Sequence, residues 1–307
     1  MSQLRIRGCL VLFAVVSLLT ACSTGWNSAA RPDFAGGAPG DGPILDTRTG
    51  GSLSRGDVMR RAIASPFVIL GEVHDNAAHH RLQAEILKAM LDAGRLPALA
   101  MEQFDLQHQP TLEAARARGE RDPERLADAG RFDRKGWRWP DYRPLVELAA
   151  LNGLALLAAN LSRADARALM KSGLPAQGIA VAAQAQRNAL EQDIIEGHCG
   201  IRPPPAMLSG MVEAQRARDA RMAETLRSAD ESGAVLVAGA GHARRDRGVP
   251  SYLPAAAREK LLSIGFVEVA RDGALPTADY AGIYDLVWYT PRATRDDPCK
   301  DLRLPFQ

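Results

Sequence analysis

The chain has 307 residues, a hydrophobic content of 46% and a formal net charge of +2. A charge so close to neutral argues against a dedicated nucleic-acid surface, because such surfaces carry a clustered excess of Lys and Arg. About 260 residues follow position 44, enough for one large domain with a hydrophobic core. The sequence has no internal repeat and no second long hydrophobic span.

The first residues have the pattern of a secretion signal. Two arginines precede an apolar run over residues 8–18, which is shorter than the roughly 20 residues that span a bilayer. The segment Leu19-Thr20-Ala21-Cys22 resembles a bacterial lipobox, in which the cysteine is acylated. We therefore expect a signal peptide over residues 1–21 and lipidation at Cys22; the alternative is an ordinary signal peptide with a chance cysteine.

Lipidation would place the protein in the cell envelope of a Gram-negative-type bacterium. Ser23 after the cysteine is not an acidic retention signal, so we expect the outer membrane. Residues 22–50 are rich in Gly and Pro and poor in apolar residues, which predicts a flexible tether. The globular domain is expected over residues 51–307.

Short apolar runs alternate with longer amphipathic segments through that domain. The expected strands are 67–70, 97–101, 154–159, 234–238, 266–270 and 284–289. The expected helices are 77–93, stretches within 105–129, 141–152, 162–171, 177–196 and 205–229. This alternation predicts a three-layer α/β/α sandwich with a mostly parallel sheet.

Polar residues follow four of the expected strands. Glu72 and His74 come after the first, Glu102 after the second, Asn160 after the third and His242 after the fourth. Ligands of open parallel sheets bind outside the carboxyl ends of the strands, so we expect these side chains to meet in one cleft. Each residue alone could instead cap a helix or make a structural hydrogen bond.

The neighbouring residues have simpler interpretations. Asn76 fits the N-cap of the helix that follows the first strand. His79 and His80 lie in the first turns of that helix, where we expect solvent exposure rather than a supporting role beside the cleft. Two cysteines follow the lipobox, Cys199 and Cys299, and an oxidising compartment favours a disulfide between them. Two separate thiols, or a soft-metal site with His198, are the alternatives.

The sequence resembles the ChaN-like haem-binding lipoproteins of the Tiki/erythromycin-esterase-like superfamily. The resemblance covers roughly residues 60–300, and the Gly-Glu-x-His and Gly-x-Gly-His segments in this order are fairly specific. The matching segments are 69–76, 100–104, 139–144, 158–160, 238–250 and 297–299.

This resemblance implies surface tethering and haem handling linked to iron uptake, with the outer-membrane haem transport machinery as a partner. It also implies haem shared between two protomers, with a tyrosinate on the ferric iron. Tyr252 is the preferred ligand, and Tyr142 in the aromatic segment 137–143 is the other candidate. Arg244, Arg245 and Arg247 could pair with haem propionates, with Asp246 beside them, or could equally be solvated.

A hydrolase, metal-assisted or not, is the second hypothesis. Glu72, His74 and His242 could supply three ligands to zinc or another divalent metal, with water in the fourth position. The sequence has no clear Ser or Cys nucleophile motif. The preferred hypothesis is a non-catalytic haem-binding protein. The third hypothesis is a structural envelope lipoprotein whose cleft is vestigial.

Overall fold

The computed structural model describes residues 42–172, 178–229, 231–270, 272–276, 278–297 and 299–300. Its centre is an eight-stranded sheet in the order β2-β1-β8-β7-β3-β6-β4-β5. The six strands from β8 to β5 run parallel, and β1 pairs antiparallel with β8 and β2. The strands are β1 (Ile44–Asp46), β2 (Ser52–Leu53), β3 (Phe67–Glu72), β4 (Ala98–Asp105), β5 (Leu156–Asn160), β6 (Ala234–Gly239), β7 (Leu261–Glu268) and β8 (Leu286–Thr290).

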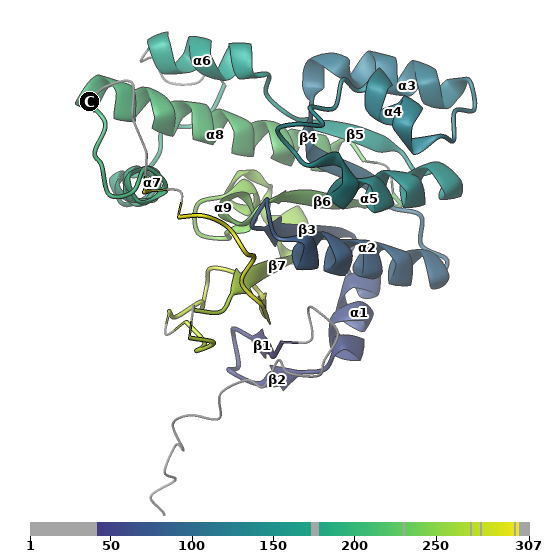
Figure 1. The fold of residues 1–307 in the computed structure, drawn as a ribbon, viewed down its shortest axis with the longest axis horizontal. Helices are drawn as coiled ribbons and strands as arrows, with labels where there is room; N and C mark the ends of the chain where they lie inside the picture. Colours follow the sequence, from purple (N-terminus) through teal and green to yellow (C-terminus); the bar gives the residue numbers. More distant parts are fainter. Residues whose placement is uncertain are drawn as a thin grey trace, which may run out of the picture. The chain divides into compact units, whose positions relative to one another are not determined.

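Helices cover both faces of the sheet and give two separate cores (Figure 1). One face is packed by α1 (Arg55–Ala64), α2 (Ala77–Asp92), α3 (Gln109–Ala117), α4 (Pro123–Ala129) and α5 (Trp139–Asn152). The other face is packed by α8 (Pro205–Arg227), α9 (Ala240–Ala243) and the 3₁₀ turn η2 (Val249–Tyr252). The remaining helical elements are η1 (Leu106–His108), α6 (Arg163–Ser172), α7 (Gln184–Gly197) and α10 (Ala255–Glu259).

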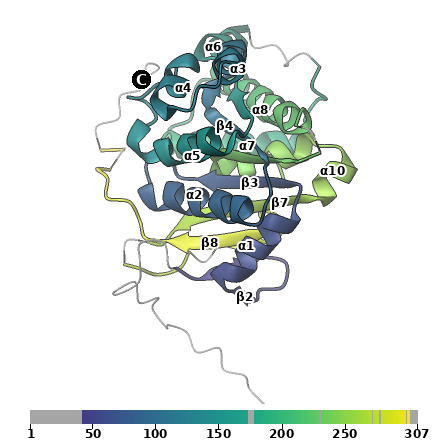
Figure 2. The same ribbon diagram turned by 90° about the vertical axis from the view of Figure 1, so that its right-hand side faces the viewer.

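The strand residues divide between the two cores by simple alternation. Val68 and Leu70 of β3 face the α2 side, whereas Ile69 faces the α8 side, because successive side chains of a strand point to opposite faces. Both faces are covered, so the central strands are mostly apolar, with polar residues chiefly near their carboxyl ends. In the first layer α2 and α5 lie side by side, and in the second α6 lies against α8 (Figures 1 and 2).

The predicted three-layer α/β/α sandwich with a mostly parallel sheet is confirmed. The expected domain boundary at residue 51 is too late, because β1 pairs Ile44 with Trp288 and so brings part of the expected tether into the sheet. The predicted signal peptide and Cys22 lie outside the described residues. Within the described ranges, no helix has the length and apolar character needed to cross a membrane.

The turn after β3 is fixed by the cap predicted from the sequence. The Asn76 side chain accepts a hydrogen bond from the Ala78 amide at 3.0 Å and caps α2. Its amide group donates to Glu268 and to the Pro291 carbonyl, at 2.8 and 3.0 Å. The first turns of α2 are therefore held tightly against the carboxyl edge of the sheet.

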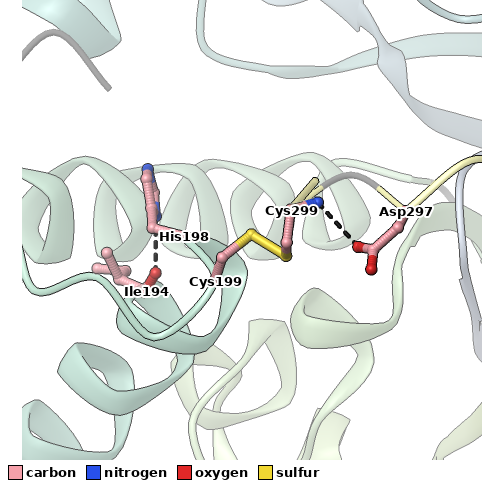
Figure 3. Close-up of a disulfide and its surroundings, with 5 residues drawn as sticks. All are labelled: Ile194, His198, Cys199, Asp297 and Cys299. Atoms are coloured by element: carbon pink, nitrogen blue, oxygen red, sulfur yellow. Dashed lines mark hydrogen bonds between the residues drawn. A yellow bond between two sulfur atoms is a disulfide. The ribbon is translucent and has the colours of Figure 1, made fainter. Parts of the chain in front are cut away.

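The disulfide between Cys199 and Cys299 is present, as predicted (Figure 3). It joins Cys199, the second residue after the end of α7, to the C-terminal segment, where Asp297 accepts a hydrogen bond from the Cys299 amide at 2.9 Å. The alternative metal site with His198 is wrong, because both sulfurs are in the disulfide. The His198 ring instead bonds the Ile194 carbonyl at 2.7 Å.

Candidate functional site

Glu72 is the centre of a buried hydrogen-bond network on the α2 side of the sheet. Its carboxylate lies at the end of β3, is 2% exposed, and receives side chains from α2, α5 and β4. Gln83 donates to Oε2 at 2.7 Å and Gln103 to Oε1 at 3.2 Å. The other contacts to the carboxylate come from His74 Nδ1 at 2.9 Å, His80 Nδ1 at 3.2 Å and the Tyr142 hydroxyl.

These contacts set the charge of Glu72. Burial alone would raise the pKa of the carboxyl, but the neighbouring His80 and His74 lower it well below its ordinary value. Burial and the adjacent Glu72 charge raise the pKa of Tyr142 far above its ordinary value, so the phenol stays a hydrogen-bond donor. The network therefore consists of an ionised carboxylate surrounded by donors.

A second buried network lies on the α8 side. His242 of α9 bonds Asp219 of α8 through Nδ1 at 2.6 Å, and its Nε2 lies 3.4 Å from Glu102 Oε1. The other Glu102 oxygen accepts the Gly239 amide at 2.8 Å. Burial alone would lower the pKa of His242, but Glu102 and Asp219 raise it to about 10, so the imidazole is a buried cation between two carboxylates.

His74 connects the two networks across the end of β6. A Cβ on Gly239 would lie 2.9 Å from the His74 ring carbon Cε1, so this glycine lets the ring sit directly over the strand. Burial alone would lower the pKa of His74, but its bond to Glu72 and the charges of Glu102 and Glu72 raise it. Its side chain is 45% exposed and Trp137 packs edge-on against the ring at 4.9 Å, so His74 is the outward-facing member.

The structure thus brings together Glu72, His74, Glu102 and His242, as predicted from the strand ends. Asn160 ends β5, and its Oδ1 is buried without a hydrogen-bond partner among the described residues. Nothing in the sequence indicated Asp219 or Gln83, which lie within the long helices α8 and α2.

The expected exposure of His79 and His80 is wrong, since both are buried. His79 bonds Thr290 at 2.7 Å and the Val73 amide at 2.9 Å, while His80 packs its ring against Tyr142 at 4.3 Å. The start of α2 is enclosed by β8 on one side and α5 on the other, so both adjacent positions lie inside.

The alternative metal site of Glu72, His74 and His242 does not fit this geometry. Five side chains contact the two Glu72 oxygens, and both His242 nitrogens face carboxylates. Among the described residues there is no group of three or more His, Cys, Asp and Glu side chains that could hold a metal ion. The predicted zinc or other divalent-metal site is therefore not supported.

A large cavity lies beside the second network, over the outward side of α8. Its volume is about 1210 Å³, and residues 178–189, α8 and η2 form most of its wall. The apolar lining includes Leu161, Leu169, Ile179 and a row of alanines, and four arginines also line it. These arginines are Arg216, Arg221, Arg227 and Arg247.

Two residues that line this cavity, Tyr252 and Arg216, each have a buried polar atom, the Tyr252 hydroxyl and Arg216 Nε, without a hydrogen bond of good geometry among the described residues. Arg216 is 3% exposed, and its other nitrogens bond Glu213 at 2.8 Å and the Ala180 carbonyl. Burial raises the pKa of Tyr252 to about 12, Asp219 acts in the same direction and the Arg216 charge opposes them. Buried polar atoms without such a bond are costly, and both of these belong to residues in the wall of one cavity.

The remaining residues predicted to contact the cofactor do not lie in one place: some line a cavity and others do not. Asp246 lines the large cavity and is paired with Arg244 at 2.9 Å, while Arg244 lines a smaller cavity of about 360 Å³. Arg245 bonds Asp285 at 2.7 Å and the Leu261 carbonyl at 2.5 Å, and lines neither cavity. Tyr142 is fully buried and Glu72 is 2% exposed, so neither lines these cavities.

A family model described as haem-binding uptake, Tiki superfamily, ChaN matches residues 58–253, which is more than half of the chain. The match includes both networks and Tyr252. No curated protein matches the sequence.

One solved structure supports the fold. Campylobacter jejuni ChaN, described with cofacial haem binding, aligns with a TM-score of 0.68 at 24% identity and covers 80% of this chain and 95% of that one. The type III effector HopBA1 aligns at 0.43 with 14% identity, covering 77% of this chain and 92% of that one. A succinoglycan biosynthesis protein aligns at 0.44 with 10% identity, covering 74% and 72%. The last two alignments are too weak to support an inference about this chain.

Proposed function

The chain belongs to the ChaN family of haem-binding uptake proteins in the Tiki superfamily, and from this premise we propose that it binds haem in the large cavity beside α8. The observation that carries the proposal is the placement of Tyr252 and Arg216, each with a buried polar atom that lacks a hydrogen bond of good geometry, in a cavity wall of mixed apolar and charged residues. The cavity volume of about 1210 Å³ exceeds the range usual for small-molecule sites, roughly 300–1,000 Å³.

The cavity offers each group that haem requires. Leu161, Leu169 and Ile179 supply apolar surface for a flat macrocycle. Tyr252 supplies a phenolic oxygen, and because burial and Asp219 raise its pKa to about 12 against the opposing Arg216 charge, ferric iron itself would have to displace the phenolic proton on binding. Haem bound here would supply ferric iron as the cargo of uptake.

Arginines at the cavity are suited to the propionates. Arg227 is exposed and makes no ion pair with a described residue, so its guanidinium can pair with a carboxylate without losing a bond. Arg221 is bonded to Glu224 at 2.5 Å, and Arg247 to Asp193 at 2.6 Å, so both would need to exchange partners. Arg227 is therefore the proposed propionate contact, rather than Arg244 or Arg245.

Hemin titration of the purified protein tests this site. We expect a saturable shifted Soret band in the wild type, a high-spin ferric spectrum with a phenolate-to-iron charge-transfer band, and loss of that band in Tyr252→Phe. Tyr280→Phe is the matched control, because Tyr280 is half-buried and lies outside the cavity. An unchanged spectrum in Tyr252→Phe would exclude this tyrosine as the ligand, and no saturable binding by the wild type would refute the proposal.

A homodimer sharing haem is part of the proposal. The wall of the cavity carries Val181, whose side chain is 87% exposed, and a second copy of the chain would cover it. Light scattering with and without hemin should show a dimer in the haem-loaded protein. A Val181→Asp variant should weaken that dimer, because it places a charge on the covered surface.

We also propose a lipid anchor at Cys22, delivery to the outer membrane and transfer of haem to or from envelope transport proteins. The support is the lipobox-like segment Leu19-Thr20-Ala21-Cys22 after an apolar run. Intact mass of the exported protein would show diacylation at Cys22 and its absence in Cys22→Ser. Sucrose-gradient fractionation then distinguishes the two membranes.

A further inference from the structure

Helix α7 forms a shared wall of both cavities beside the second network. Its first half, with the residues just before it, lines the large cavity, and its second half lines the smaller one. Displacing α7 would therefore open both cavities. The α7 residues involved are Ala185, Gln186 and Ala189 for the large cavity and Leu190, Asp193, Ile194 and Glu196 for the small one.

The helix itself is weakly anchored by apolar packing. Of the 14 residues of α7, only Leu190 and Ile195 are buried. Polar contacts hold the rest: Arg187 bonds Glu213 at 3.0 Å and Ser209 at 2.9 Å, both on α8. Few buried apolar contacts are a property of segments that open locally at low free-energy cost.

The C-terminal strap, residues 291–297 and 299–300, is by contrast firmly attached to the carboxyl edge of the sheet. Arg295 binds Glu268 with two nitrogens, at 2.8 and 2.5 Å, and Asp75 at 2.6 Å. The Ala293 amide donates to Glu268 at 2.9 Å. Asp75 lies in the turn that carries His74, so the strap is fixed to the same turn as the first network.

The Cys199–Cys299 disulfide is the covalent link between this strap and the end of α7 (Figure 3). Cys299 is exposed and Cys199 is only partly buried, so a dithiol in solution can reach the bond. Reduction transfers two electrons and two protons from the dithiol to the two sulfurs, which become thiols, while the dithiol becomes a disulfide.

We propose that this disulfide is a redox-sensitive clasp on the cavity wall. When it is closed, the strap holds the C-terminal end of α7, which lines the smaller cavity, and so limits displacement of the whole helix, including the first half that lines the ligand cavity. When a dithiol reduces it, α7 retains only its polar contacts and two buried side chains, and the cavity opens more often. If the protein binds haem as proposed above, the consequence is faster haem release from the reduced protein. This consequence rests on the proposed haem function.

Two measurements on the full chain test the clasp. Hydrogen exchange of the haem-free protein should show amides of residues 184–197 exchanging about 10-fold faster after reduction, with α2 amides unchanged. Hemin transfer from the loaded protein to apomyoglobin should accelerate about 10-fold on reduction, the size of an ordinary coupling between two sites. The Cys199→Ser/Cys299→Ser variant should match the reduced wild type in both measurements and should not respond to dithiothreitol, which controls for effects of the reagent on haem.

An Arg295→Met variant separates the strap from the cysteines. It keeps the disulfide but removes the ion pairs that fix the strap, so it should speed exchange in α7 in the oxidised protein. Equal exchange in oxidised, reduced and double-serine proteins would overturn the clasp, whether or not the protein binds haem. If the oxidised wild type fails to bind hemin but α7 exchange still responds to reduction, the haem function is refuted and the clasp survives.

Discussion

Replacing His242 by glutamine should remove a specific part of the pH dependence of stability. In the folded protein, burial alone would lower the pKa of His242, but Glu102 of β4 and Asp219 of α8 raise it to about 10. The charge of His74 also interacts with that of His242. In the unfolded chain the imidazole titrates near its ordinary value of about 6.5. Because the folded pKa is the higher one, the stabilisation is complete below about pH 6.5 and is lost as pH rises toward 10.

The expected magnitude follows from proton linkage. Between these two pKa values the folded protein holds one more proton than the unfolded chain, so each pH unit removes about 1.4 kcal/mol of stability. From about pH 7 to about pH 9.5 the His242 contribution to the unfolding free energy should fall by about 3 kcal/mol in the wild type. Urea unfolding followed by tryptophan fluorescence, with the disulfide intact, measures this difference.

The His242→Gln variant is the comparison that isolates the effect. His74 and His80 also have raised pKa values, but they are present in both proteins and contribute to both curves. The variant should be less stable at about pH 7 and should lose markedly less stability than the wild type by about pH 9.5. Parallel curves for the two proteins over this range would refute a buried imidazolium at this position.

Three further changes test the geometry of the site. Tyr142→Phe leaves the buried Glu72 carboxylate without one donor and should cost about 1–3 kcal/mol of unfolding free energy in urea, whereas an unchanged midpoint would contradict the bond. Gly239→Ala puts a Cβ against the His74 ring, so NMR titration should show the pKa of His74 falling back toward its ordinary value; an unaltered titration would mean the ring lies elsewhere. Ile86→Ala in the α2 core should cost about 2–5 kcal/mol of unfolding free energy, and a loss below about 1 kcal/mol would contradict its burial.

The central sheet could be predicted because each parallel strand is covered on both faces. Residues 234–238 of β6 are apolar throughout for that reason, and a continuous run of this kind is visible without any alignment. The N-terminal strands could not be found in this way. β1 is three residues long and its pairing with β8 joins positions more than 200 residues apart, so nothing local in the sequence indicates it.

Only the site residues that directly follow strands could be predicted from the sequence. Glu72, Glu102 and His242 follow apolar runs, and the topology of a parallel sheet then places them at one edge. Asp219 and Arg216 lie within a long helix whose sequence mixes alanine with charged residues, and their burial depends on α7 and η2 packing over α8. The error on His79 and His80 has the same origin, since their partners Thr290 and Tyr142 come from distant elements.

The second network and the proposed haem cavity share one helix, and this explains why a haem-binding fold would keep a costly cluster of buried charges. Burying an ion pair rarely improves stability over well-packed apolar residues, so such clusters are better understood as devices that fix geometry. Asp219 is held by His242, and through it by Glu102 at the sheet edge. On the same helix, Arg216, about one turn before Asp219, and Ala220, the residue directly after it, line the cavity. The charged network therefore fixes the position of α8 relative to the sheet, and the position of α8 sets the shape of the surface on which haem would lie.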